Sequence, residues 1–145
     1  MRALIQKVSE ASVHVNGAVK GSIGKGLLIF LGVRDDDTED KARSLAEKCV
    51  NLRVFEDEAG KVNHSVLEVG GEVLVVSQFT LYGDTRKGRR PSFIRAAAPD
   101  VSEPLYETFV GFVREYGVRV ATGQFRTYMA VHLVNDGPVT VMAEK

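Results

Sequence analysis

The chain has 145 residues, of which 44% are hydrophobic, and its 19 basic and 19 acidic residues cancel to a formal net charge of zero. This length and apolar content suit one domain whose core needs no disulfide bonds. Zero net charge excludes a global positive field as the basis of nucleic-acid binding, so any such contact must come from a local patch. No apolar run reaches the roughly 18 residues of a membrane span, and residues 1–6 lack the apolar core of a signal peptide. We therefore expect a soluble, cytoplasmic protein.

The first third of the chain predicts strands followed by a helix. Alternating apolar residues predict strands over 3–9, 12–15 and 18–23, and Asn16-Gly17 is the hairpin turn between the last two. Residues 27–33 are apolar on both alternating faces, which is typical of a central strand covered on both sides. The Asp35-Asp36-Asp37 cluster leads into Thr38, which is placed as a helix N-cap, so capping explains these acids better than a metal does. The buried stripe of this helix is predicted to be Ala42, Leu45, Ala46, Cys49 and Val50.

The remaining chain predicts a second helix and several short strands. The helix spans residues 102–116, with Pro104 in its first turn, Gly117 at its end, and an apolar stripe of Leu105, Phe109, Phe112, Val113 and Tyr116. Further strands are predicted over 52–55, 72–79, 118–121, 129–135 and 139–143. Many strands with two helices do not fit a doubly wound parallel sheet, which needs a crossover helix between successive strands. We expect an α+β fold over residues 1–145, a single domain with a mainly antiparallel, barrel-like sheet flanked by two main helices.

Metal and nucleotide-cofactor sites are not predicted. His14, His64 and His132 are far apart in sequence and match no metal-binding spacing. His132 lies inside an apolar strand, which favours a structural histidine with satisfied hydrogen bonds. Cys49 has no second cysteine to pair with, and its place on the helical stripe indicates a buried, reduced thiol. Neither a Walker loop nor a dinucleotide-binding fingerprint occurs, so we expect no metal and no cofactor.

Two polar segments follow strongly apolar strands. Ser77-Gln78-Phe79-Thr80-Leu81 ends the strand predicted over 72–79 with three hydrogen-bonding side chains around one aromatic ring. Asn135-Asp136-Gly137-Pro138-Val139-Thr140 lies between two apolar runs near the C-terminus. A Gly-Pro pair alone normally marks a turn. Together, two polar segments at the ends of buried strands could build one pocket.

A basic run follows the first of these segments directly. Arg86, Lys87, Arg89 and Arg90 are four cations within five residues. Such a run usually faces water as a solvated loop. Beside a pocket that takes a nucleic acid, the same cations would contact phosphates, and the sequence leaves both readings open.

The two polar segments together closely resemble the paired signature of the D-aminoacyl-tRNA deacylases, also called D-tyrosyl-tRNA deacylases. The resemblance covers essentially the whole chain, including residues 2–8, 24–28, 90–93 and 122–125. One departure is Lys7, where many members of the family carry an arginine. The substitution keeps the charge but loses the planar fork that binds two acceptors at once.

The resemblance implies a homodimeric enzyme that hydrolyses the ester between a D-amino acid, or glycine, and the terminal adenosine of tRNA. It also implies a cis peptide bond between Gly137 and Pro138, which would enter the partner subunit's pocket. There its carbonyl groups would exclude an L side chain by steric clash, a rejection that glycine escapes because it has no side chain.

The resemblance assigns the chemistry to Ser77, Gln78, Phe79 and Thr80. The Thr80 hydroxyl is the obvious nucleophile, but the sequence shows no base to activate it. The family instead implies that the ribose 2′-hydroxyl assists, while backbone N–H groups near Phe79 and Thr80 polarise the ester carbonyl. Ser77 and Gln78 would hold the adenosine and the pocket wall, and Phe79 would pack either on the adenosine or in the core.

Two other classes of function remain as alternatives. One is a non-catalytic RNA-binding dimer module that uses the basic run for backbone contact. The other is a small-molecule esterase with a Ser/His/Asp triad assembled in space, which would depend on His132.

Overall fold

The computed structural model describes the backbone of residues 1–145 and every side chain except that of residue 138. The elements are β1 (Arg2–Val15), β2 (Ala18–Ile23), β3 (Gly26–Gly32), α1 (Glu39–Asn51), β4 (Phe55–Glu56), β5 (Val62–His64), β6 (Glu72–Ser77), η1 (Phe79–Tyr82), α2 (Pro99–Glu115), β7 (Val120–Thr122) and β8 (Ala130–Glu144). Two are α-helices, and η1 is a 3-10 helix. A six-stranded sheet has the order β2-β1-β3-β6-β7, with β8 paired to β1, and a separate two-stranded sheet joins β4 and β5.

The sheet is mixed, with its antiparallel part built around β1. This strand pairs antiparallel with β2, β3 and β8. β6 pairs parallel with both β3 and β7. Each parallel connection contains one of the two helices, because parallel neighbours need a long crossover. The expected α+β class, with a barrel-like sheet and two flanking helices, is therefore confirmed.

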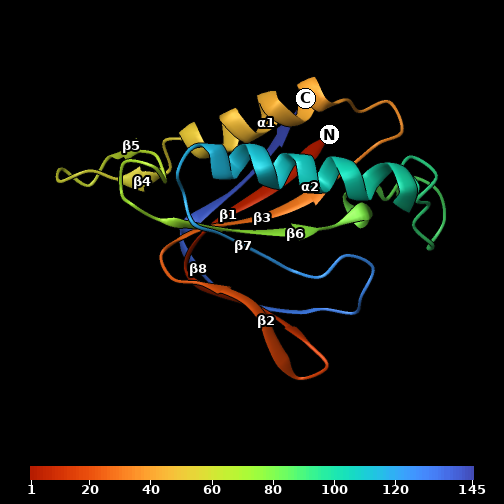
Figure 1. Cartoon of the computed structure of the whole chain (residues 1–145), viewed down its shortest axis with the longest axis horizontal. Coiled ribbons are helices and arrows are strands. Elements are labelled where there is room, and N and C mark those ends of the chain that lie inside the picture. Colours follow the sequence, from red (N-terminus) through yellow and green to blue (C-terminus); the bar gives the residue numbers. More distant parts are fainter.

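Both faces of the sheet are covered. Helices α1 and α2 lie together across one face, above β1, β3 and β6 (Figure 1), and pack Leu45 and Phe109 against Leu27 and Ile29. On the opposite face, Leu28 and Leu74 join a second core with Val8, Val13, Ile23 and Val76. Residues 27–33 thus form the doubly covered central strand that their pattern predicts.

The sheet curls until β2 approaches β7. A Cβ atom added to Gly21 on β2 would lie 2.5 Å from the backbone oxygen of Thr122 on β7. Only a residue without a side chain permits this approach. The close contact explains how the sheet becomes nearly closed although β2 and β7 are not paired with each other.

Helix α1 follows its sequence prediction closely. The Thr38 hydroxyl caps it by accepting a hydrogen bond from the N–H of Lys41 at 3.3 Å. Its buried residues are Ala42, Leu45, Ala46, Cys49 and Val50, as predicted. Burial raises the pKa of the Cys49 thiol to about 12, which keeps it neutral and unreactive.

Helix α2 begins earlier than predicted. Pro99, rather than Pro104, lies in its first turn, where a missing N–H costs nothing. Pro104 lies inside the helix on an exposed face, so water can reach the carbonyl that its missing N–H leaves free. The buried stripe contains Tyr106, whose hydroxyl donates to the Val75 carbonyl at 2.8 Å, whereas Tyr116 is exposed. Gly117 ends the helix with a φ of 80°.

Several predicted strand boundaries are wrong. The strands predicted over 3–9 and 12–15 form the single strand β1, and those predicted over 129–135 and 139–143 form the single strand β8. The pairing between β1 and β8 continues across the polar residues with shifts in register. The strand predicted over 72–79 stops at Ser77. The strand predicted over 52–55 reduces to Phe55–Glu56, which pairs with β5 outside the main sheet.

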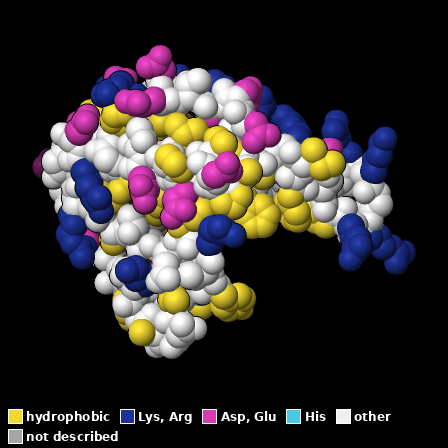
Figure 2. Space-filling model, turned by 45° about the vertical axis from the view of Figure 1, so that its right-hand side comes forward, with side chains coloured by type: hydrophobic (Ala, Val, Ile, Leu, Met, Phe, Trp, Pro, Cys, Tyr) yellow, Lys and Arg dark blue, Asp and Glu magenta, His cyan; other side chains and the backbone are white. Residues whose placement is uncertain are grey.

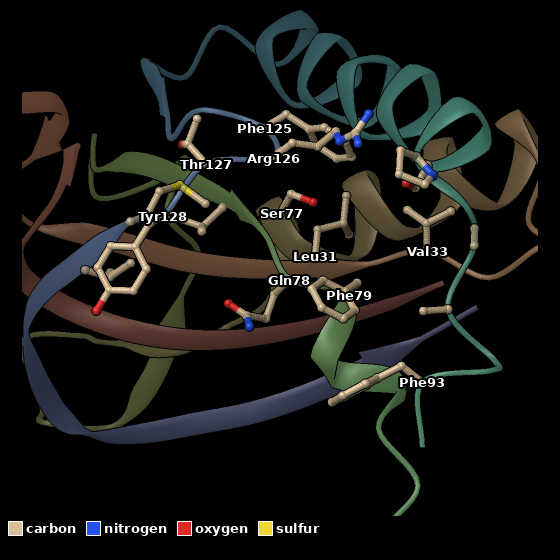
Figure 3. A pocket seen from close by; sticks show the side chains of 17 residues that line it. Leu31, Val33, Ser77, Gln78, Phe79, Phe93, Phe125, Arg126, Thr127 and Tyr128 are labelled. Atoms are coloured by element: carbon tan, nitrogen blue, oxygen red, sulfur yellow. The ribbon is translucent and has the colours of Figure 1, made fainter. Parts of the chain in front are cut away.

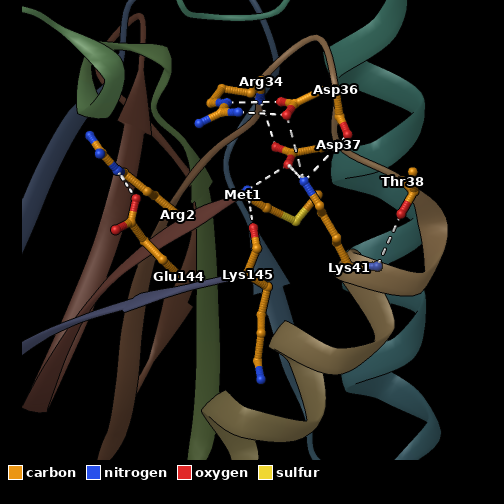
Figure 4. A network of polar contacts seen from close by, with 9 residues as sticks. All are labelled: Met1, Arg2, Arg34, Asp36, Asp37, Thr38, Lys41, Glu144 and Lys145. Carbon is orange, nitrogen blue, oxygen red and sulfur yellow. Dashed lines mark hydrogen bonds and ion pairs between the residues drawn. The ribbon is translucent and has the colours of Figure 1, made fainter.

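A buried ion pair holds the chain ends beside the start of α1 (Figure 4). The Met1 amino group donates to Asp37 Oδ1 at 2.6 Å and to the Lys145 carbonyl at 2.7 Å. Asp37 is fully buried and also accepts from the Arg34 N–H at 2.7 Å and from Lys41 Nζ at 3.3 Å. Arg2 and Glu144 form a second ion pair on the neighbouring strands β1 and β8. These contacts fix β1, β8 and the α1 N-terminus relative to one another.

Candidate active site

The segment Ser77 to Thr80 lies where the parallel strands β3 and β6 end. The Gln78 N–H donates to the Leu31 carbonyl at 2.8 Å, which continues the strand pairing for one residue. The chain then turns into the 3-10 helix η1, with Phe79 and Thr80 as its first residues. Ser77 and Gln78 are half-buried, whereas Phe79 and Thr80 are exposed. Polar groups therefore collect at the C-terminal edge of the two strands.

A cavity of about 680 Å³ opens beside this edge, a volume typical of small-molecule sites. Ser77, Gln78 and Phe79 lie on its wall (Figure 3). The opposite wall comes from the segment between β7 and β8. Most of the lining is apolar or aromatic: Leu31, Val33, Val76, Phe93, Ala96, Ala97, Pro99, Phe125, Tyr128, Met129 and Val131; Ser102, Arg126 and Thr127 complete it.

The cavity offers no side chain that could act as a general base at neutral pH. Among the described residues that line it, none is a histidine, aspartate, glutamate or cysteine. Thr80 is not a lining residue either, and its hydroxyl accepts a hydrogen bond from the Gln78 amide. Within the described part of the chain, no three His, Cys, Asp or Glu side chains gather into a candidate metal site.

Backbone donors are the polar groups that this edge does provide. Phe79 and Thr80 occupy the first two positions of η1, where an N–H has no carbonyl partner within the helix. Gln78, the residue before them, makes no capping hydrogen bond with its side chain. Two N–H groups beside the cavity are thus free of intrahelical bonds.

Phe79 is a surface residue and not part of the core. Its side chain is 55% exposed and meets the ring of Phe93 edge to face, with ring centroids 5.3 Å apart. Of the two positions that the sequence leaves open for Phe79, the structure excludes the one in the core. The aromatic pair forms one rim of the cavity (Figure 3).

The segment Asn135 to Thr140 forms an irregularity in β8. Gln6 pairs with Thr140 and Val8 with Asn135, so residues 136–139 lie opposite Lys7 alone. The Asn135 amide closes this bulge by donating to the Lys7 carbonyl at 2.9 Å and to the Val139 carbonyl at 3.1 Å. The predicted turn at Gly137 is therefore a bulge within a continuous strand. The expected cis bond involves Pro138, whose side chain lies outside the described part of the chain, and it stays a prediction.

Gly137 is exposed and has a φ of 144°. A Cβ atom there would lie 2.9 Å from Cε of Lys7, whose side chain is buried beneath the bulge. The Lys7 side chain thus packs against the backbone of Gly137. Gly137 does not line the cavity of its own subunit.

The basic run forms the tip of a projecting loop, visible as a group of dark blue side chains at the right of Figure 2. Asp84 and Ser92 close the loop with two backbone hydrogen bonds of 2.8 and 2.9 Å. Asp84 also binds the N–H and guanidinium of Arg86, which holds the pKa of that carboxyl well below its usual range. Within the described chain, no carboxylate pairs with Lys87, Arg89 or Arg90, and all three are exposed. Arg86 therefore belongs to the loop's structure.

His132 is a surface residue, although it lies inside an apolar strand. It lies exposed on β8, with its ring centroid 4.4 Å from that of His14 on β1. Strand alternation turns it away from the core, which Val131 and Leu133 meet. It does not line the cavity that Ser77 faces.

The family model described as "D-Tyr-tRNA(Tyr) deacylase" matches residues 4–144. The chain belongs to this deacylase family. A D-aminoacyl-tRNA deacylase of Thermotoga petrophila is 58% identical over 144 residues, which cover 99% of this chain and 97% of that relative. The relative of the same name from Anaeromyxobacter dehalogenans is also 58% identical, over the same shares of the two chains.

Solved structures agree with the deacylase family at the level of the fold. The c-Myc DNA Unwinding Element Binding Protein is 40% identical, with a TM-score of 0.94 over 100% of this chain and 99% of that one. A probable eukaryotic D-amino acid tRNA deacylase has a TM-score of 0.85 at 22% identity, over 99% of this chain and 98% of that one. The second likeness shows that the deacylase fold persists at low sequence identity.

The sequence predicts the polar edge of the cavity but not its other lining residues. Phe93, Phe125 and Tyr128 line the cavity, although the sequence predicts no role for them. Arg126 was missed as well, and its φ of 58° is one of two positive values among non-glycine residues, the other being Asn16. Such a conformation costs about 1–3 kcal/mol and depends on tertiary contacts. The local sequence therefore does not predict the positive φ of Arg126.

Proposed function

We propose that the chain is a D-aminoacyl-tRNA deacylase. It hydrolyses the ester between a D-amino acid and the terminal adenosine of tRNA, releases both, and rejects L-aminoacyl-tRNA. The observation that carries this function is membership of the deacylase family over residues 4–144, with relatives named D-aminoacyl-tRNA deacylase at 58% identity over 99% of the chain. The absence of a membrane-spanning helix from the described residues is compatible with the cytoplasmic location we propose.

In our mechanism, the protein supplies backbone donors and the substrate supplies a hydroxyl. The N–H groups of Phe79 and Thr80 polarise the ester carbonyl, and the ribose 2′-hydroxyl assists the attack of water. The lack of an acid or base among the described lining residues supports this division of roles. Ser77 and Gln78 hold the adenosine and the pocket wall, and the exposed ring of Phe79 offers a face for the adenine.

The stereochemical filter is supplied by a second subunit. In this homodimer, Gly137 and Pro138 of each subunit enter the pocket of its partner, and their carbonyl groups clash with an L side chain. Two observations support the proposal: Gly137 is exposed, and it does not line its own subunit's cavity. Asn135 and Lys7 fix the direction of the bulge from its two sides. Glycyl-tRNA escapes the clash and is hydrolysed too.

The basic loop contacts phosphates of the acceptor end. Arg86 shapes the loop through Asp84, whereas Lys87, Arg89 and Arg90 supply the contacts themselves. The free charges and exposure of these three residues support this division.

The test is the release of amino acid from D-Tyr-tRNA and from L-Tyr-tRNA by the purified protein. We expect rapid release of D-tyrosine and essentially none of L-tyrosine. Equal hydrolysis of both substrates, or of neither, would contradict the proposed function.

A second candidate is a non-catalytic nucleic-acid-binding dimer. The observation that favours it is the 40% identity with the c-Myc DNA Unwinding Element Binding Protein. This candidate predicts salt-sensitive binding of tRNA with no ester cleavage. A triad esterase is disfavoured, because the described residues that line the cavity include no histidine and no carboxylate.

A further inference from the structure

Arg126 is the only charged side chain among the described residues that line the cavity. It lies in the segment between β7 and β8, on the side of the cavity opposite Gln78 and Phe79 (Figure 3). The mechanism proposed above gives it no role. A single cation in an otherwise apolar and aromatic cavity selects for an anionic group on the ligand.

The backbone holds Arg126 in a conformation that L residues rarely adopt. Its φ is 58°, and the other non-glycine residue with a positive φ is an asparagine in a hairpin turn, where that residue type is favoured. Contacts on both sides impose this conformation. The Gly123 N–H donates to the Val75 carbonyl at 3.2 Å, and the Thr127 hydroxyl donates to the Gln124 carbonyl at 2.9 Å. Strained residues cluster at ligand sites, so an arginine held here points to a binding role.

The guanidinium of Arg126 is free to bind a ligand. Within the part of the chain that the structure describes, no carboxylate lies within 4.0 Å of it, in contrast to Arg86, which Asp84 holds. Arg126 is exposed, although it lines the cavity. Its planar fork matches two oxygens of a phosphate or a carboxylate.

We propose that Arg126 binds a backbone phosphate of the last nucleotides at the 3′ end of the tRNA. This inference rests on the proposed function, because that function places the terminal adenosine beside Gln78 and Phe79. A phosphate of the same strand would then reach across the cavity to Arg126, the one cation among the described lining residues. Arg126 is a binding residue that orients the ester and takes no part in its hydrolysis.

The experiment compares Arg126→Gly with the wild type on D-Tyr-tRNA over a range of salt concentrations. We expect KM to rise about 10-fold at low salt, since a charge-assisted contact is lost. The slope of log(kcat/KM) against log[salt] falls in magnitude by about 0.7, the value for one phosphate on a single strand. Arg126→Lys keeps most of the slope. The thermal midpoint of Arg126→Gly does not fall, because glycine adopts the positive φ freely.

Asn16→Gly is the matched control, since it places glycine at the other positive-φ residue, outside the cavity. It leaves KM and the salt slope unchanged. An unchanged slope in Arg126→Gly, with the wild type active, would overturn this inference and leave the proposed function intact. If the wild type released no D-tyrosine, the proposed function would fail first.

A third arm separates phosphate from carboxylate recognition. D-Asp-tRNA carries a carboxylate on its amino acid, and D-Tyr-tRNA does not. A phosphate contact predicts the same rise in KM for both substrates. A rise confined to D-Asp-tRNA would assign Arg126 to the amino-acid side chain and contradict the proposal.

Discussion

At the scale of single residues, the site contrasts with enzymes that act through a nucleophilic side chain. Thr80, the residue whose type most suggests a nucleophile, is outside the cavity lining, and its hydroxyl is bound to Gln78. The sequence predicts which residues are polar at this edge. It does not reveal that η1 begins at Phe79 and leaves N–H groups free there, because that depends on where β6 stops.

Thr80→Ala tests whether the hydroxyl takes part in hydrolysis. We expect kcat for D-Tyr-tRNA to stay within about 10-fold of the wild type, since the proposed mechanism uses backbone and substrate groups, whereas removing a true nucleophile costs several orders of magnitude. Single-turnover deacylation measures the effect. A loss of several orders of magnitude, with an unchanged thermal midpoint, would restore Thr80 as the nucleophile.

Asp37→Asn tests the buried ion pair at the chain ends. The substitution leaves the Met1 ammonium buried without its counter-charge, so we expect the free energy of unfolding to fall by about 3–5 kcal/mol. Urea unfolding measures the change. Asp35→Asn is the control, because Asp35 is an exposed neighbour, and it should cost less than about 0.5 kcal/mol. Equal effects of the two substitutions would show that the pair contributes nothing specific.

At the scale of elements, periodicity predicted most helices and strands, while their ends depended on tertiary contacts. The helical spacing of the apolar residues within 42–50 correctly predicted the buried face of α1. The start of α2 was predicted wrongly because either Pro99 or Pro104 could occupy the first turn of a helix. The local sequence does not distinguish the two, and the structure has Pro99 there. The bulge at residues 136–139 was expected as a turn, since Gly-Pro breaks local pairing, but β1 holds the strand on both sides of it.

The basic loop carries a prediction at this scale. Each of the single substitutions Lys87→Ala, Arg89→Ala and Arg90→Ala should reduce the magnitude of the slope of log(kcat/KM) against log[salt]. The expected reduction is about 0.9, the value for one duplex phosphate. Arg86→Ala should change the slope less, because Asp84 already neutralises that charge. The control is Lys48→Ala on the exposed side of α1, which should leave the slope unchanged. If all four loop variants kept the wild-type slope, the loop would be a solvated surface without a role in binding.

At the scale of the whole molecule, the proposed active site needs two subunits. The sequence already held both halves of it, in the segments 77–81 and 135–140. It could not show that Gly137 is absent from the lining of its own subunit's cavity, because that follows from how β8 runs along β1 and from the bulge that Asn135 closes. Catalysis and stereochemical selection are thus assigned to different chains of one dimer.

Gly137→Ala is expected to disturb the filter and leave the fold intact. A Cβ atom there would lie 2.9 Å from the backbone nitrogen of Val139, and the φ of 144° is one that L side chains rarely adopt, so the bulge must shift and its carbonyl directions change. Gly111→Ala on α2 is the matched control, because a Cβ atom at Gly111 meets no atom within 4 Å. The control should preserve both activity and stability.

The decisive measurement is the ratio of kcat/KM for D-Tyr-tRNA to that for L-Tyr-tRNA, determined side by side for the wild type, Gly137→Ala and Gly111→Ala. We predict a large ratio for the wild type and Gly111→Ala. For Gly137→Ala, we predict either a ratio reduced at least about 10-fold or a loss of activity, since one misplaced carbonyl removes a contact worth about 1.4 kcal/mol or more. A wild-type ratio near one, or an unchanged ratio and rate in Gly137→Ala, would contradict a deacylase that selects D-aminoacyl-tRNA through this segment.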